Sequence, residues 1–263
     1  MSDPVLLDIT DDGIARIRLN RPEAANGLDA TLLRALNDAV LSCHGDPRTR
    51  VVVLSGEGPN FCAGGDVKTF ASKGEGLPDY LREATAWLQI ATASLLRLKA
   101  PVVTGVHGFA AGGGGLGLVC ASDLVVAARS ARIFSGAARV GMAPDGGTSV
   151  TLTQIVGARK AMELLLLNPT LTADEALAIG LVNEVVDDDQ LDKRLLALAG
   201  ELAAMAPLAL AATKRLVWAG LGATIEERLG EEARVVSELS GTADAREGLA
   251  AVIERRAPAF EGR

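Results

Sequence analysis

The stretch Ala-Gly-Gly-Gly-Gly-Leu-Gly at 111–117 and the shorter stretch Cys-Ala-Gly-Gly-Asp at 62–66 decide the fold of this chain. Each directly follows an apolar run rich in β-branched residues, at 101–106 and at 51–54. Such runs are typical of buried strands, and glycine permits the tight backbone turns that follow them. We therefore expect each turn to leave a strand end and to lead into a helix.

These two glycine turns share a chemical property. The first N–H groups of a helix lack intrahelical partners and lie at the positive end of the helix dipole, which favours negative charge. One N–H from each turn, aimed at the same point, would form an oxyanion hole, which stabilises charge developing on a carbonyl oxygen. The sequence therefore predicts that two distant backbone amides converge on one oxygen atom.

Composition narrows the classes of function. The chain has 263 residues, 49% of them hydrophobic, which suits one large domain or a domain with an appendage. A net charge of −7 and 3% aromatic residues disfavour nucleic-acid and membrane-surface binding. Without an apolar run of about 18 residues or a signal-peptide start, a cytoplasmic protein is expected. Cys43, Cys62 and Cys120 lack metal-type spacing, so we expect buried free thiols and no metal site.

Strand-like and helical patterns alternate from Val5 to about Val186, which indicates an α/β arrangement of parallel strands joined by crossover helices. Beyond this point the chain is rich in Leu and Ala and predicts only helices. The polar, glycine-containing segment 70–80 is interpreted as a mobile lid or loop, with an ordinary surface connection as the alternative. The four C-terminal helices are expected at about 190–204, 207–219, 224–239 and 243–256.

The chain resembles members of the crotonase (enoyl-CoA hydratase/isomerase) superfamily. The resemblance rests on short motifs whose order and spacing extend over nearly the whole chain. They lie at 20–22, 61–66, 107–117, 121–124, 140–148, 171–176, 180–183 and 246–248.

The resemblance implies a crotonase-like spiral of ββα repeats followed by an all-helical C-terminal region. It implies a core with the acyl-CoA site at 1–190 and an oligomerisation region at 191–263, assembled as a homo-trimer or a hexamer made of two trimers. It also implies that no cofactor is permanently bound and that coenzyme A enters as part of the substrate.

The resemblance assigns the oxyanion-hole donors to the backbone N–H groups of Gly65 and Gly114. Because four glycines stand where three are usual, Gly113 is the alternative second donor. Arg21, Lys68, Arg97 and Lys99 are candidate phosphate partners, each with an ordinary solvated charge as the alternative. The implied substrate contacts are Glu23, Ala24, Ala25, Ala63, Asp66, Val67, Lys68, Gly113, Ala137 and Phe260, the last reaching the substrate of a neighbouring subunit.

Hydratases of this family use two glutamates, and both are missing here. Their positions fall at Gly117 (or Leu116, under the other count) and at Ala137. Asp145 remains, and relatives that isomerise dienoyl thioesters or dehalogenate aryl thioesters place a working aspartate at the corresponding turn. Because one base can remove and return a proton, we expect double-bond isomerisation rather than two-glutamate hydration.

Several alternatives stay open. A dehalogenase-like hydrolase would use Asp145 as its nucleophile, but Gln89 and Ala137 stand where its histidine and tryptophan would be. Asp145 alternatively serves only its turn, and Asp66 is expected to cap a helix. A hydratase that uses Asp145 and a CoA-ester-binding relative without catalysis are further possibilities. A nucleotide-dependent oxidoreductase is disfavoured, because the glycine fingerprint lacks the acidic residue expected about twenty positions later.

Overall fold

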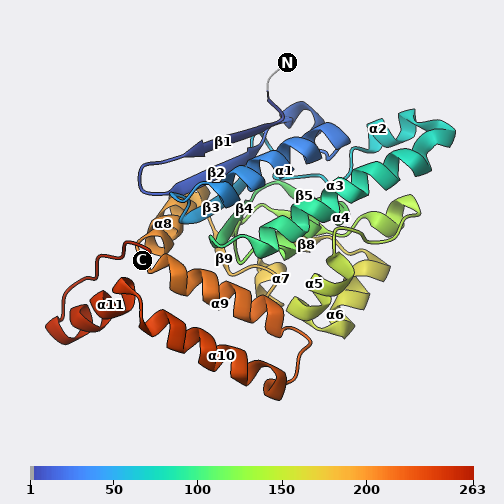
Figure 1. The fold of residues 1–263 in the computed structure, drawn as a ribbon. Coiled ribbons are helices and arrows are strands. Elements are labelled where there is room, and N and C mark those ends of the chain that lie inside the picture. Colours follow the sequence, from blue (N-terminus) through green and yellow to red (C-terminus); the bar gives the residue numbers. More distant parts are fainter. Residues whose placement is uncertain (1–2) are drawn as a thin grey trace.

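The computed structural model describes residues 3–263 and shows a mixed α/β fold (Figure 1). Its main sheet has the strand order β1-β2-β3-β4-β6-β9, in which only the β1–β2 pair is antiparallel. A smaller sheet has the order β5-β7-β8. The strands are β1 Val5–Ile9, β2 Ile14–Leu19, β3 Val51–Gly56, β4 Val102–Val106, β5 Phe109–Ala111, β6 Leu124–Ala128, β7 Arg132–Phe134, β8 Leu171–Thr172 and β9 Glu184–Val186.

Helices connect the strands and form the whole C-terminal region. They are α1 Ala30–Gly45, α2 Val67–Ser72, α3 Leu77–Arg97, α4 Gly112–Cys120, α5 Thr148–Val156, α6 Ala158–Met162, α7 Ala173–Ala178, α8 Leu191–Ala203, α9 Pro207–Gly220, α10 Ile225–Ser240 and α11 Ala243–Glu254. Short 3-10 helices span Pro22–Ala24, Gly74–Gly76, Ala137–Val140 and Asp188–Gln190, and a π-helical turn spans Glu163–Leu167. The four predicted C-terminal helices are thus confirmed to within about two residues at each end.

Two hydrophobic cores lie on opposite faces of the main sheet. The larger core packs α1, α3 and α4 against one face. On the other face, α8 buries Leu191, Leu195, Ala199 and Ala203, whose spacing of four residues forms one stripe of the helix. This helix therefore packs as part of the α/β core, although it follows residue 190. The division of the chain into two domains stays a prediction.

The small sheet brings the two glycine turns together. Cys62 pairs with Ala110 as an isolated parallel bridge beside β5. In this bridge the Cys62 N–H donates to Phe109 O at 2.9 Å, and the Ala111 N–H donates to Cys62 O at 2.9 Å. The chain therefore leaves the first turn directly alongside the start of the second.

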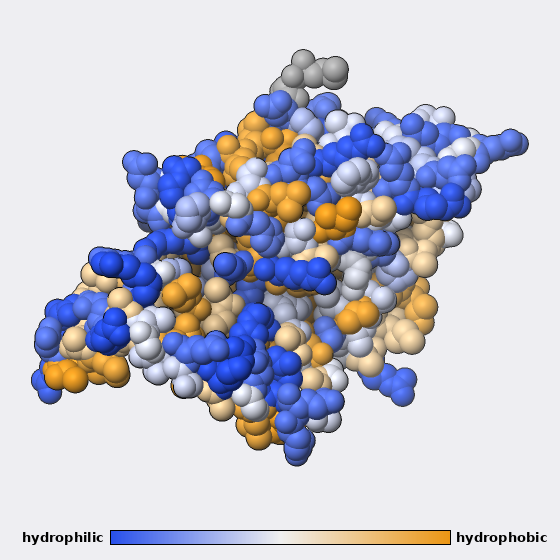
Figure 2. Space-filling model, in the orientation of Figure 1, coloured by the Kyte–Doolittle hydropathy of each residue, from blue (hydrophilic) through white to orange (hydrophobic). Residues whose placement is uncertain are grey.

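Helices α9, α10 and α11 form an arm beside the core (Figure 1). Leu229, Val236 and Val252 of this arm are exposed. Figure 2 shows hydrophobic patches at the surface of the arm. A buried ion pair attaches α9 to the core, because Lys214 Nζ lies 2.7 Å from Asp123 Oδ2. Within residues 3–263, no helix alone meets the length and hydropathy expected of a membrane span, whereas the bent pair Asp188–Ala203 and Pro207–Gly220 does so jointly.

The interpretation of 70–80 as a lid or loop is wrong in its secondary structure, because this segment is mostly helical, whereas the alternative of a surface connection fits it. It contains the end of α2, a 3-10 turn and the start of α3. Asp66 caps α2, and Phe70 and Tyr80 stack edge to face with ring centroids 6.1 Å apart. The glycines and polar residues that suggested a loop instead lie on a short helical connection held by this aromatic pair.

Candidate active site

The two glycine turns touch through their backbones. A Cβ built on Gly64 would lie 2.6 Å from Ala111 O, and one built on Gly112 would lie 3.0 Å from Gly64 Cα and 3.5 Å from Gly65 N. Gly64 and Gly112 also have positive φ angles of 89° and 66°. Only glycine fits both the space and the backbone conformation at these two positions.

Helix α4 begins inside the second turn, at Gly112, and presents its N-terminus there. Ala111 is the N-cap, and within the described residues no side chain caps this helix. The N–H groups of its first turn, those of Gly113 and Gly114 included, therefore have no intrahelical acceptor. Gly114 packs against Leu28, which holds the start of the helix in place. These amides can bind an anionic oxygen.

Asp145 lies against the second glycine turn. A Cβ built on Gly113 would lie only 1.3 Å from Asp145 Oδ1, so the carboxylate occupies the space beside the Gly113 Cα atom. The backbone of Asp145 accepts from the Thr148 N–H at 3.1 Å and from Thr148 Oγ1 at 2.7 Å. Gly146 and Gly147 complete the turn at φ angles of 57° and 80°. Asp145 thus opens a turn with its backbone and leaves its carboxylate directed at α4.

The surroundings of Asp145 favour its protonated form. Burial raises the pKa of this carboxyl above its ordinary value, and a hydrogen bond from its own backbone partly opposes the rise. Across residues 3–263, no lysine, arginine or histidine forms a salt bridge with it. A half-buried carboxylate without a cation partner binds protons more strongly than a solvated one, which suits a general base.

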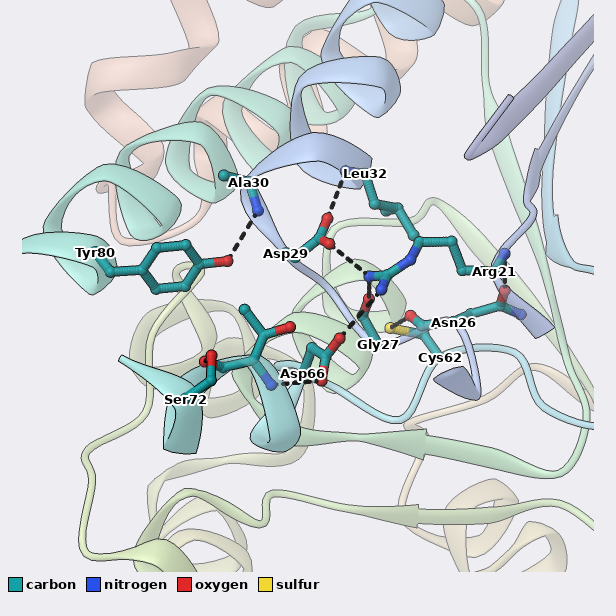
Figure 3. Close-up of polar contacts among 11 residues, drawn as sticks. Arg21, Asn26, Gly27, Asp29, Ala30, Leu32, Cys62, Asp66, Ser72 and Tyr80 are labelled. Carbon is teal, nitrogen blue, oxygen red and sulfur yellow. Dashed lines mark hydrogen bonds and ion pairs between the residues drawn. The ribbon is translucent and has the colours of Figure 1, made fainter. Parts of the chain in front are cut away.

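Asp66, at the end of the first glycine turn, has the opposite environment (Figure 3). Its carboxylate accepts from the Thr69 N–H at 3.0 Å as the cap of α2, and Arg21 Nη2 lies 3.2 Å from its Oδ2. Burial raises the pKa of Asp66, but the hydrogen bonds from Thr69 and the Arg21 charge outweigh this and lower it overall. The predicted capping role of Asp66 is confirmed.

Arg21 joins the loop between β2 and α1 to the first glycine turn (Figure 3). Besides Asp66, its guanidinium contacts Asp29 Oδ2 at 2.9 Å and donates to Gly27 O at 2.8 Å. The Arg21 side chain is therefore neither free to bind phosphate nor an ordinary solvated charge. This role could not be read from its position in the sequence, because Asp66 lies on a separate loop.

Two hydrophobic residues near the turns were missed by the sequence analysis. The ring of Phe70 covers Gly65, since a Cβ on Gly65 would lie 2.5 Å from two ring carbons. Leu88 of α3 lies against Gly146 in the Asp145 turn. An aromatic residue four positions after the capping aspartate was the available indication for Phe70, whereas Leu88 had none.

Most predicted contact residues lie around the glycine turns. Ala25 O accepts from the Ala63 N–H at 3.0 Å, which places the segment 23–25 beside the first turn. Val67 and Lys68 are exposed on α2. Ala137 is buried, and its neighbour Gly136 packs against Gly112.

Three predicted residues lie elsewhere. Phe260 packs on Gly248 of α11, and its carbonyl accepts from Arg50 Nη2 at 2.9 Å. Arg97 is exposed in the last turn of α3, and Lys99 lines a separate cavity near the start of β4. Within one chain these residues do not join the glycine turns.

Comparisons with known proteins agree with this geometry. Residues 10–263 match the family model described as enoyl-CoA hydratase/isomerase. A protein of Rhodobacter capsulatus named "Probable enoyl-CoA hydratase" is 38% identical, with 96% of each chain covered. The 1,2-epoxyphenylacetyl-CoA isomerase of Escherichia coli is 32% identical, with 98% of each chain covered.

The fold comparison gives the same result. The crystal structure of an enoyl-CoA hydratase from Polaromonas sp. JS666 matches with a TM-score of 0.93 at 30% identity, over 98% of this chain and 99% of that one. The predicted crotonase fold with its helical C-terminal region is thereby confirmed. By sequence and by structure, over nearly its whole length, the chain belongs to the enoyl-CoA hydratase/isomerase family, within the crotonase superfamily.

Proposed function

We propose that the protein isomerises a double bond in an acyl-CoA thioester through an enolate intermediate. The thioester oxygen is bound by the N–H groups of Gly65 and Gly114, with Gly113 as the alternative second donor. The observation that carries the proposal is the contact between the Asp145 carboxylate and Gly113, directly beside this pair of amides. A base and an oxyanion hole at one point are the equipment that enolate formation requires.

Asp145 moves the proton in this reaction. Its carboxylate removes a proton from the α carbon of a β,γ-enoyl ester or from the γ carbon of an α,β-enoyl ester. The C–H electron pair forms a new carbon–carbon double bond, and the carbonyl π pair moves onto the thioester oxygen. The enolate then collapses, and Asp145 returns the proton at the other carbon of the shifted double bond. No atom is gained or lost, so the product is an isomer of the substrate.

The lack of a second carboxylate supports isomerisation over two-glutamate hydration. At Gly117 an added Cβ would lie 3.3 Å from Thr148 Oγ1 and 3.4 Å from Gly146 O, so the Asp145 turn borders this position closely, and the position carries no acid. Ala137, the second position, is buried and carries no acid. The relative named 1,2-epoxyphenylacetyl-CoA isomerase supports isomerase chemistry on a CoA thioester within the family.

Hydration that uses Asp145 alone is the second candidate. The observation in its favour is the naming of the relatives, because the Rhodobacter capsulatus and Polaromonas proteins are both called enoyl-CoA hydratases. In this reaction Asp145 would hold and deprotonate a water molecule that adds to the conjugated double bond.

The same proposal includes assembly into a trimer or a hexamer. Support comes from the exposed hydrophobic side chains of α10 and α11 and from Phe260, which has no contact with the glycine turns of its own chain. In the assembly Phe260 contacts the coenzyme A part of a substrate bound to a neighbouring subunit.

A panel of CoA esters tests the reaction class. The protein is incubated with conjugated and non-conjugated enoyl-CoA, dienoyl-CoA and aryl-CoA esters, and products are followed by ultraviolet absorbance and mass. Isomerisation gives a product of unchanged mass with altered thioester absorbance. A product heavier by one water supports the hydratase candidate, and binding without any product leaves only a CoA-ester-binding protein.

A further inference from the structure

Asn168 is a buried polar residue that the proposed mechanism does not yet use. It follows the π-helical turn Glu163–Leu167, is 6% exposed and has a φ angle of 54°. Its side-chain Oδ1 accepts from the Gly136 N–H at 2.5 Å, and its Nδ2 donates to Leu165 O at 3.1 Å. Both ends of the buried amide are therefore used, and one of them holds a residue next to the site.

The loop that contains Gly136 is fastened to Asn168 a second time. The guanidinium of Arg139 donates to Asn168 O at 2.5 Å and to Thr170 Oγ1 at 3.1 Å, and it lies 4.7 Å from the centre of the Phe134 ring. The Asn168 side chain thus binds the backbone of the loop at Gly136, and the Arg139 side chain of the loop binds the backbone of Asn168. The loop cannot shift without breaking both.

Gly136 transmits this restraint to the glycine turns. A Cβ on Gly136 would lie 3.5 Å from Gly112 N, and one on Gly112 would lie 3.5 Å from Gly65 N. Gly136, Gly112 and Gly64 all have positive φ angles, of 73°, 66° and 89°. Gly136, Gly112 and Gly64 therefore lie in a row so close that a Cβ on one would contact the next, and the Asn168 amide fixes the outermost one.

We infer that Asn168 is a positioning residue, which holds Gly136 against Gly112 and so fixes the direction of the N–H donors at the start of α4. The inference rests on the proposed oxyanion function of those donors. Without the amide, the Gly136 N–H loses its acceptor and the second turn loses its support. A displacement of about 1 Å in catalytic geometry can cost on the order of 10²-fold in rate.

The residue type fits this double task. Asparagine is among the few residues other than glycine that adopt a positive φ readily, and its side chain supplies the acceptor. Asn168→Gly keeps the backbone conformation and removes the acceptor. Asn168→Asp keeps a side chain of the same shape and the acceptor for the Gly136 N–H, and it gives up only the Nδ2 donation to Leu165 O, which does not involve the glycine turns. These two variants separate the hydrogen bond from the backbone conformation.

A matched control is available in the main sheet. Asn183 Oδ1 accepts from the Val125 N–H at 2.8 Å, a bond of the same kind that does not involve the glycine turns. Asn183→Ala removes a comparable side-chain-to-backbone bond and is expected to affect thermal stability without changing kcat. It shows how much a purely structural loss contributes.

Steady-state kinetics on an enoyl-CoA ester turned over by the wild type tests the inference. We expect Asn168→Gly to lower kcat about 10- to 100-fold with KM changed less than about threefold, because the support acts on transition-state geometry. Asn168→Asp should restore kcat to within about threefold of wild type. An Asn168→Gly variant with the kcat of Asn183→Ala, or a failure of Asn168→Asp to restore kcat, overturns the inference.

Calorimetric binding separates this inference from the proposed function. If the wild type turns over no ester, the proposed reaction fails, and the affinities for butyryl-CoA and for free CoA then decide. A loss in Asn168→Gly confined to the thioester supports the positioning role, because free CoA has no carbonyl for the amides to bind. Equal losses for both ligands, or none, overturn it.

Discussion

Asp66 ends the first glycine turn and Asp145 contacts the second, yet the two carboxylates are held in opposite ways. Asp66 caps α2, pairs with Arg21 and has a lowered pKa. Asp145 has no salt-bridge partner among residues 3–263 and has a pKa raised by burial. Whether an aspartate beside a glycine turn can accept a proton therefore depends mainly on the charged and hydrogen-bonding groups around it.

The two glycine turns also use charge for different purposes. On the first side, Arg21 binds two aspartates and a backbone carbonyl, so charge there fastens loops together. On the second side, the charge of Asp145 is left unpaired beside a helix N-terminus. A fixed framework and a proton acceptor with an available lone pair are both needed for the proposed reaction.

The largest expected effect is the loss of turnover when the proposed base, Asp145, is replaced. Asp145→Asn should lower turnover of an enoyl-CoA ester about 10²- to 10⁴-fold, because a positioned general base contributes that much. Binding of the ester should remain nearly intact, since the amide is isosteric with the carboxyl group. Kinetics and calorimetry on the same preparation measure both quantities.

Asp66→Asn is the matched control for this loss. Asparagine also caps helices well, so α2 keeps its cap and turnover should fall less than about tenfold. Wild-type turnover in Asp145→Asn would remove Asp145 from the mechanism. Equal losses in the two variants would show that the contrast between the carboxylates has no catalytic meaning.

The next expected effect is a loss of stability when Arg21, which joins the loops around the first glycine turn, is replaced. Arg21→Met should lower the free energy of unfolding by about 2 kcal/mol, since it leaves two half-buried carboxylates without their cation. The estimate lies below that for a fully buried pair because the Arg21 side chain keeps 21% of its exposure. Urea denaturation measures it.

Arg18 provides the comparison for Arg21. It pairs with Asp8 and Glu57 at a more exposed position, so Arg18→Met should cost less than about 1 kcal/mol. Arg21→Lys should recover only part of the loss, because lysine lacks the planar fork that reaches several acceptors at once. An Arg21→Met variant as stable as Arg18→Met would contradict the framework role.

Local chemistry made much of this molecule predictable. The glycine turns lie after strands and lead into helices because strand runs, glycine and a capping Asp66 are all local features. The C-terminal helices follow from their composition and their starts, such as the capping box at Thr224 and Glu227. The spiral order of the repeats came from the family resemblance, since periodicity does not encode which strands are neighbours.

Contacts between distant segments were not predictable. Arg21 was a candidate phosphate partner because nothing local shows that Asp29 and Asp66 surround it. The segment 70–80 was expected to be a loop because the stacking of Phe70 on Tyr80 depends on how two helices fold back. Likewise, the direction of the Asp145 carboxylate depends on the missing side chain of Gly113.

The smallest expected effect is on stability. Replacing Asp145 and replacing Asp66 should change the free energy of unfolding with opposite signs at neutral pH. The folded-state pKa of Asp145 is raised above its ordinary value of 3.8, so stability falls as pH rises from 3.8 to the folded pKa, and the full cost is present above it. Asp145→Asn should therefore stabilise the protein at pH 7 by on the order of 1 kcal/mol. The gain should disappear below the ordinary pKa, where the carboxyl is protonated in both states.

Asp66 should show the reverse. Its folded-state pKa is lowered, so its carboxylate stabilises the protein above the ordinary value of 3.8, and this contribution is lost as pH falls through the folded pKa. Asp66→Asn should cost about 1 kcal/mol at pH 7 and less in acid. Urea midpoints for both variants at pH 7 and near pH 3 measure the two signs. If both variants destabilise the protein at pH 7, Asp145 is held by contacts as favourable as those of Asp66, and its role as an unpaired base loses its physical ground.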